Sequence, residues 1–206
     1  MPFRPAVLLL LPLLGLTQCI MGDNGPMPKD KMPDATQTGA NTAGCFVDGL
    51  LWVPRNNGEG AGGAPLPAIV ASWRKIRGGR HPLALTFTKN IDDRSHVHGE
   101  TGLTLYLPDI TQPGTFVLDQ EAHTMVVNGP TAYAGFQFNR SPTHELLTGP
   151  GAPGRLVVTR LDTSSRVVSG TFEFTPAEVS GGLTGGTPVP GGITARVTEG
   201  RFDCKF

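Results

Sequence analysis

The residues best suited to chemistry lie in one polar stretch, Asp92 to Glu100. In an extended chain the side chains of His96, His98 and Glu100 point the same way. Two imidazoles and a carboxylate with an open fourth position are a ligand set that catalytic zinc sites use. The alternative is a polar surface loop, in which Arg94 would disfavour a bound cation. A metal-dependent envelope hydrolase using these three residues is therefore one hypothesis.

Other catalytic motifs are missing from the sequence. It has no Gly-x-Ser-x-Gly elbow, so the common esterase geometry has no support. Its two glycine-rich stretches, 58–63 and 181–192, lack the Lys-Ser/Thr that follows a phosphate-binding loop. It also has no Cys-x-x-Cys pair for thiol redox chemistry. We therefore expect a non-enzyme without a cofactor.

Four aromatic side chains could form a sugar-stacking platform: Trp52, Trp73, Tyr106 and Tyr133. Trp73 and Tyr106 are the ligand-binding candidates, because each lies beside a polar loop. The alternative is that these rings pack in the core, as aromatic residues in strands commonly do. A carbohydrate or small-ligand capture module is thus a second hypothesis.

The charges limit the class of partner. The 206 residues carry 17 Lys and Arg against 17 Asp and Glu, with no basic stripe and no acidic tract. Duplex nucleic acid, which is bound through many phosphate contacts, is therefore not an expected partner.

The first 18 residues are predicted to be a signal peptide. Arg4 precedes an apolar run, Ala6 to Leu16, which is shorter than the roughly 20 residues that span a bilayer. The run ends in Leu16-Thr17-Gln18-Cys19, which resembles a bacterial lipobox with Gln18 where Gly, Ala or Ser is usual. The resemblance implies that Cys19 carries acyl chains such as palmitate. The alternative is an ordinary secretory signal with an incidental cysteine.

Residues 19–43 are predicted to be a flexible tether, and residues 44–206 a folded domain. The tether is rich in Gly, Pro, Asn, Asp, Lys and Thr and has almost no apolar residues to offset its ordering entropy. Lipid on Cys19 would hold the chain at a membrane without a transmembrane helix. We expect it to be exported and anchored in the cell envelope, at the outer membrane.

The domain is predicted to be an antiparallel β-sandwich of about nine or ten strands. Gly 28 and Pro 19 together make up nearly a quarter of the chain, which favours many short strands and turns. Arg155 to Pro176 reads as a hairpin around the polar turn Asp162 to Ser165. Its second arm alternates apolar and polar residues, so one face is expected in the core.

Further turns and strands follow from the same reasoning. Asp48-Gly49 predicts a two-residue hairpin that pairs Val47 with Leu50 and Cys45 with Trp52, all four facing the core. Ala68 to Arg77 fits a helix or a strand, and we favour a strand. Strands are also predicted at 83–88, 103–107, 115–118, 125–127, 132–138 and 193–206, and loops at 90–100 and 177–192. In the last strand the apolar residues lie at odd positions before Glu199-Gly200 and at even positions after it. One extra residue would cause this change, which predicts a β-bulge at Gly200.

Cys45 and Cys204 lie in the first and last predicted strands, on inward faces. Export would place them in an oxidising compartment, where a disulfide between them would persist and close nearly the whole domain. The alternative is a pair of buried thiols that pack as small apolar groups.

Three sequence blocks resemble the recurrent blocks of an uncharacterised lipoprotein family of Bacteroidetes-type envelopes. They are residues 41–52, 168–174 and 197–203, and the similarity covers most of 41–206. The resemblance implies an envelope location and a β fold, and no site residues. The first hypothesis is accordingly a membrane-tethered, non-catalytic binding or structural module, whose partner is an envelope protein or a glycan.

Overall fold

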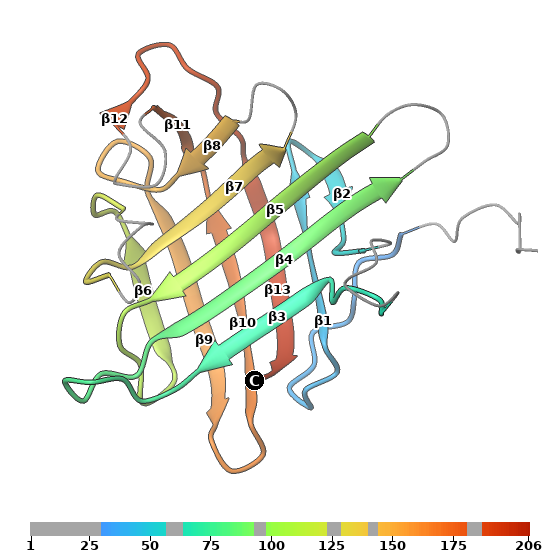
Figure 1. Ribbon diagram of the computed structural model, residues 1–206, viewed down its shortest axis with the longest axis vertical. Helices are drawn as coiled ribbons and strands as arrows, with labels where there is room; N and C mark the ends of the chain where they lie inside the picture. Colours follow the sequence, from blue (N-terminus) through green and yellow to red (C-terminus); the bar gives the residue numbers. More distant parts are fainter. Residues whose placement is uncertain (1–29, 57–63, 93–97, 123–128, 140–143, 181–186) are drawn as a thin grey trace, which may run out of the picture.

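The computed structural model describes residues 30–56, 64–92, 98–122, 129–139, 144–180 and 187–206. These residues form two antiparallel sheets that pack face to face (Figure 1), which confirms the predicted β-sandwich. The described ranges hold thirteen strands rather than nine or ten. They contain no helix with the length and apolarity that crossing a bilayer would require.

The six-stranded sheet runs in the order β2 (Leu50–Trp52), β1 (Thr42–Val47), β13 (Val197–Lys205), β10 (Val167–Phe174), β9 (Gly154–Asp162) and β6 (Gly114–Leu118). The seven-stranded sheet runs β12 (Thr187–Pro188), β11 (Ala177–Ser180), β8 (His144–Leu147), β7 (Tyr133–Asn139), β5 (His98–Leu107), β4 (Leu83–Asp92) and β3 (Ile69–Trp73). All pairings between these strands are antiparallel.

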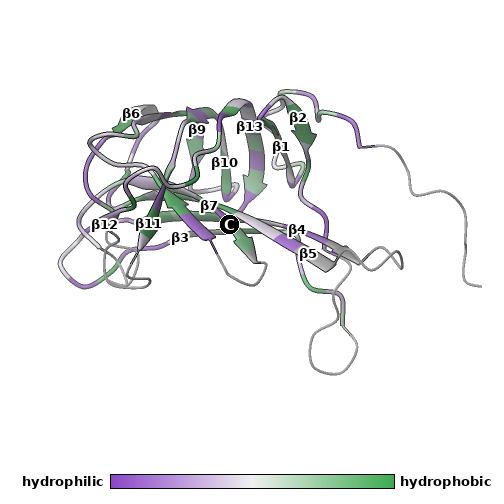
Figure 2. Cartoon of the chain, turned by 90° about the horizontal axis from the view of Figure 1, so that it is seen from above, coloured by the Kyte–Doolittle hydropathy of each residue, from purple (hydrophilic) through white to green (hydrophobic). Residues whose placement is uncertain are grey.

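The core lies between the two sheets. Figure 2 shows the two layers from above, with apolar residues along the strands of both. Alternation along each strand produces the core, because successive side chains point to opposite faces. On β5, for example, Leu103, Leu105 and Leu107 are fully buried while Thr104 is only half-buried. Strand β3, which the sequence also allowed as a helix, pairs with β4 and so is a strand.

The β9–β10 hairpin matches its prediction. Its inward residues on β10 are buried, and Thr171 and Glu173 on the other face are exposed. The turn is held by the Asp162 carboxylate, whose Oδ1 accepts the backbone N–H of Ser164 at 3.0 Å and of Ser165 at 2.9 Å. These bonds and the Arg160 guanidinium hold the pKa of Asp162 below its usual range; the largest contribution is the Ser165 N–H.

The first hairpin has the predicted register but differs at one residue. Val47 pairs with Leu50 and Cys45 with Trp52, and Asp48 and Gly49 both have positive φ. Three of the four residues are buried, but Leu50 is 76% exposed. The prediction for Leu50 is wrong because β2 is a three-residue edge strand at which the facing sheet no longer covers the hairpin turn.

The predicted bulge in the last strand is present. On β13, Gly200 pairs with Phe172 but Val197 pairs with Phe174, so one extra residue lies between them. Glu199 absorbs the strain with a φ of 53°. Gly200 is required for a different reason, because a Cβ there would lie 2.4 Å from the Phe172 ring.

Two predicted loops contain strands instead. Strand β4 continues to Asp92 and β5 begins at His98, so most of 90–100 is paired. Strands β11 and β12 occupy part of 177–192. In both places the paired strands continue beyond the region that the core covers. Their residues therefore do not alternate between apolar and polar over a long stretch, and the sequence gives no strong strand signal there. The strand predicted at 125–127 lies outside the described residues.

The predicted disulfide is not present, since Cys45 and Cys204 are both free and fully buried. Thr42 pairs with Asp203, so the position opposite Cys204 is residue 41, four residues along β1 from Cys45. Four residues of strand span about 13 Å, beyond the roughly 7 Å limit between bridged Cα atoms. Burial raises the pKa of both thiols to about 12, so they pack as inert apolar groups.

The prediction of a flexible tether up to residue 43 is wrong for its described part. Residues 30–41, which we call the strap, lie against the six-stranded sheet on its outer face. Asp30 forms ion pairs with Arg55 at 2.5 Å and with Lys89 at 2.9 Å. A Cβ on Gly44 would lie 2.8 Å from the Pro33 ring, so the strap packs directly on β1. Residues 1–29 lie outside the described residues.

Candidate functional site

The strap is held by one buried carboxylate that sequence reasoning missed. Asp203 is 1% exposed and accepts the backbone N–H groups of Thr38, Gly39 and Ala40 at 2.8–3.1 Å. It also accepts the hydroxyls of Thr36 at 2.6 Å and Ser169 at 2.7 Å. Burial opposes its ionisation, but the hydrogen bonds outweigh it and hold the pKa of Asp203 below its usual range. Because its acceptor capacity is used internally, this carboxylate has a structural role.

The predicted metal ligands are not assembled by the described residues. Glu100 is exposed on β5, where it pairs with Asn90 and Asn139. His98 begins β5, but its side chain lies outside the described residues, as does His96 entirely. Among the residues that the structure describes, no group of His, Cys, Asp and Glu could hold a metal ion.

Trp73 and Tyr106 do not form a common platform. Trp73 pairs with Leu83 and faces the core side, whereas Tyr106 pairs with Ala84 and faces outward. The Trp73 Nε1–H donates to the Ile110 carbonyl at 2.9 Å, and its ring stacks on His81.

The Tyr106 side chain is likewise packed against other residues of the protein. Tyr106 is 8% exposed, and its hydroxyl donates to the Gly129 carbonyl at 3.1 Å. Its ring packs on Tyr133 with centroids 5.3 Å apart. Burial raises the pKa of both phenols, that of Tyr133 to about 12. Both aromatic candidates therefore contribute contacts to the fold, and they lie on opposite faces of the seven-stranded sheet.

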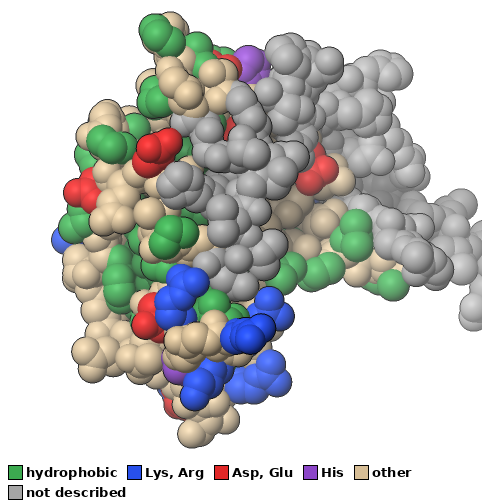
Figure 3. All heavy atoms as spheres, turned by 60° about the vertical axis from the view of Figure 1, so that its left-hand side comes forward, with side chains coloured by type: hydrophobic (Ala, Val, Ile, Leu, Met, Phe, Trp, Pro, Cys, Tyr) green, Lys and Arg blue, Asp and Glu red, His purple; other side chains and the backbone are tan. Residues whose placement is uncertain are grey.

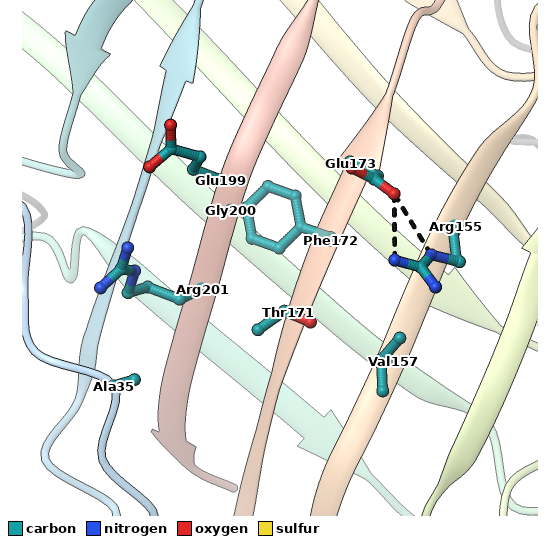
Figure 4. Close-up of a pocket in the computed structure, with 9 residues that line it drawn as sticks. All are labelled: Ala35, Arg155, Val157, Thr171, Phe172, Glu173, Glu199, Gly200 and Arg201. Carbon is teal, nitrogen blue, oxygen red and sulfur yellow. Dashed lines mark hydrogen bonds and ion pairs between the residues drawn. The ribbon is translucent and has the colours of Figure 1, made fainter.

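A shallow groove crosses the outer face of the six-stranded sheet beside the strap (Figure 4). Its volume is about 350 Å³. The Arg155 guanidinium pairs across it with Glu173 at 3.1 Å, and Arg201 donates to the Pro33 carbonyl at 3.4 Å. Both cations are thus satisfied within the protein, on a surface that is open to water. A ligand in this groove would therefore gain few polar interactions beyond those that it already makes with water.

The larger hollow, which we call the edge cavity, has a volume of about 440 Å³. It lies on the outer face of the seven-stranded sheet, because Leu147 and Ala177 pair on the face opposite to the core residue Leu146. Small and apolar residues dominate its lining: Ala122, Leu147, Pro150, Ala152, Ala177, Val179 and Pro188, with Glu121, Thr148 and Thr187 as its polar members. Pockets of this size and character bind small molecules.

One wall of the edge cavity is a tight turn. The backbone groups of Gly149 and Ala152 exchange two hydrogen bonds of 3.0 Å around Pro150 and Gly151. Thr148 beside it is 2% exposed, and its hydroxyl accepts the Ala134 N–H at 3.0 Å. This wall is therefore preformed, which lowers the entropy cost of binding.

The opposite wall is the β11–β12 hairpin, which is held by Glu178. Its Oε1 lies 2.7 Å from His144 Nδ1, and its Oε2 accepts the Ile193 N–H at 2.8 Å. These contacts lower the pKa of Glu178, the Ile193 N–H having the largest effect. The carboxylate and imidazole lie on the face of β11 away from Ala177 and Val179, so they position the wall without entering the cavity.

Sequence reasoning missed the edge cavity because much of its lining comes from the 177–192 stretch, which was predicted as a loop, and from the turn that follows β8. Both the 141–153 and 177–192 stretches are rich in Gly and Pro, which signals turns but not what the turns enclose. The apolar residues Leu147 and Val179 within these stretches were the sequence feature that could have indicated an apolar site.

Comparison of the chain with protein-family models, with curated proteins and with solved structures found no match.

Proposed function

We propose that the chain is a non-catalytic binding module, anchored to the cell envelope by lipid on Cys19, that holds a small apolar ligand in the edge cavity. The observation that carries the binding role is the cavity itself: about 440 Å³, apolar, and walled by a preformed turn. The signal-peptide pattern, the lipobox-like residues 16–19 and the resemblance to envelope lipoproteins support the anchor.

The ligand class follows from the lining. Leu147, Ala177 and Val179 present carbon atoms, and burying apolar surface contributes about 25 cal/mol per Å². Glu121 is the one charged residue among the described lining, and it is exposed. An uncharged molecule of drug size, or one end of an acyl chain, meets these conditions better than a sugar or a nucleotide.

The ligand proposal is tested by titrating the chain from residue 19, as Cys19→Ser, with the neutral apolar dye N-phenyl-1-naphthylamine. We expect saturable fluorescence enhancement at one site. Val179→Trp places an indole in the cavity and should abolish saturable binding. Val70→Trp is the matched control, because Val70 is 47% exposed on β3, at the opposite edge of the seven-stranded sheet, and should leave binding intact. Equal dye binding by both variants would refute the edge cavity as the site.

The anchor is tested separately by metabolic labelling of the full chain with a palmitate analogue. We expect label on the wild type and none on Cys19→Ala, while Met21→Ala, two residues away, keeps it. Label that persists in Cys19→Ala would show that another residue is modified.

A further inference from the structure

The turn between β3 and β4 carries a dense group of cations. Arg74, Lys75, Arg77 and Arg80 fall within seven residues, which we call the basic hairpin, and the first three are exposed. Figure 3 shows Lys and Arg side chains gathered at this end of the molecule. The chain as a whole balances 17 cations against 17 anions, so this grouping makes the domain electrically polar.

Three of the four cations of the basic hairpin have no ion-pair partner in the described part of the chain. Within the described ranges, no ion pair involves Arg74, Lys75 or Arg77. The acid Asp109 at its base is engaged by His81, since it accepts the His81 backbone N–H at 2.7 Å and lies 3.8 Å from the His81 ring. Three exposed cations are left to attract an external anion.

The backbone of the basic hairpin is a defined turn. Ile76 N–H donates to the Arg80 carbonyl at 2.9 Å, and Gly79 N–H donates back to the Ile76 carbonyl at 3.1 Å. Gly78 and Gly79 have φ of 97° and 83°, which glycine alone adopts without strain. The stacked rings of Trp73 and His81, 5.1 Å apart, fix its base. The cations are therefore displayed from a rigid support.

More cations lie at the same end of the domain. The Phe206 ring packs 5.6 Å from Trp73, which brings the end of β13 beside the base of the hairpin. Lys205 precedes it, and Arg166 lies beside it, since its carbonyl accepts the Phe206 N–H at 3.0 Å. Both side chains are exposed, so the positive region extends beyond one turn.

We infer that the basic hairpin docks the domain on the anionic phospholipid headgroups of the membrane that carries its lipid anchor. The inference rests on the proposed anchor. The eleven Cα-to-Cα steps from Cys19 to Asp30 can span about 36–40 Å. Asp30 binds Lys89 on β4, and the hairpin lies about 20 Å further along that strand. The membrane surface is thus within reach of the hairpin.

The test is flotation of the chain from residue 19, as Cys19→Ser, with vesicles of phosphatidylcholine alone or mixed with phosphatidylglycerol. Without an acyl chain, any binding comes from the protein surface, so failure of the lipid anchor cannot be mistaken for failure of the docking surface. We expect binding to the anionic vesicles only, and release by salt that screens charges. Arg74→Gln, Lys75→Gln and Arg77→Gln together should weaken the partition about a hundredfold, since each cation near a charged surface contributes a few-fold.

The matched control removes three exposed cations from other parts of the domain: Lys31→Gln, Arg155→Gln and Arg196→Gln. It has the same net charge and should keep most of the binding. Equal loss in the two triple variants, or equal binding to neutral vesicles, would overturn the proposal. Binding to a DNA duplex with no binding to vesicles would overturn it too, in favour of a different polyanion. Unchanged thermal midpoints would show that both variants fold.

Discussion

On the outer face of the six-stranded sheet the strap covers a buried carboxylate, whereas on the outer face of the seven-stranded sheet Leu147 and Ala177 line an open cavity. The first surface is polar and complete, because each donor around Asp203 has its acceptor. The second is apolar and has no protein segment among its described neighbours that fills it. Strong internal hydrogen bonding thus marks a structural region, and uncovered carbon surface marks the region available to a ligand.

The largest expected effect comes from removing the negative charge of Asp203, which lies under the strap. In Asp203→Asn one oxygen becomes an NH₂ group, which cannot accept, so either the Gly39 N–H at Oδ1 or the Thr38 and Ala40 N–H groups at Oδ2 lose their acceptor. Leaving buried donors unpaired should lower the free energy of unfolding by about 3 kcal/mol. Urea unfolding measures it, with Asp34→Asn, an exposed carboxylate in the same strap, expected within about 0.5 kcal/mol of wild type. Dye binding in the edge cavity should survive the change.

The same carboxylate predicts a pH dependence. The pKa of Asp203 is lower in the folded state than its unfolded value of about 3.9, so its contribution is complete above that value. It is lost as the pH falls toward the folded pKa, because the unfolded state then binds the proton more readily. The stability difference between wild type and Asp203→Asn should therefore shrink from about pH 5 to pH 2. A constant difference across that range would mean that Asp203 acts through packing alone.

A pair of glycine substitutions compares the two regions by packing. A methyl group on Gly44 in β1, under the strap, would lie 2.8 Å from the Pro33 ring, so Gly44→Ala should destabilise the fold by about 1–3 kcal/mol. Gly151 at the cavity rim has no atom within 4 Å of its Cβ position, and Gly151→Ala should change stability by less than about 0.5 kcal/mol. Thermal unfolding distinguishes them, and equal losses would remove the contrast between a closed and an open surface.

What could be predicted from the sequence follows the same division. The hairpin pairing around Asp48-Gly49, the faces of β10 and the bulge before Gly200 were predictable, because alternation and turn chemistry act locally. The strap was not, since it is held by Asp203, which is 164 residues away from Gly39, and by ion pairs to Arg55 and Lys89, and composition does not record such contacts. The disulfide prediction was wrong because the inward faces of Cys45 and Cys204 do not determine the register of β1 against β13. In the observed register the two cysteines are too far apart to be bridged.

The smallest expected effect concerns the β11–β12 wall of the edge cavity. Glu178→Ala removes both oxygens, so the contacts with the Ile193 N–H and with the His144 ring are lost. Both contacts lie at the sheet edge, and we expect global unfolding to stay unchanged while amide exchange at Ile193 becomes faster. Glu173→Ala, which breaks the exposed pair with Arg155 on the other sheet, is the control and should not alter exchange at Ile193. Slow exchange at Ile193 in both variants would show that the β11–β12 wall is held by its backbone pairing and not by Glu178, and would remove the difference in firmness between this wall and the strap.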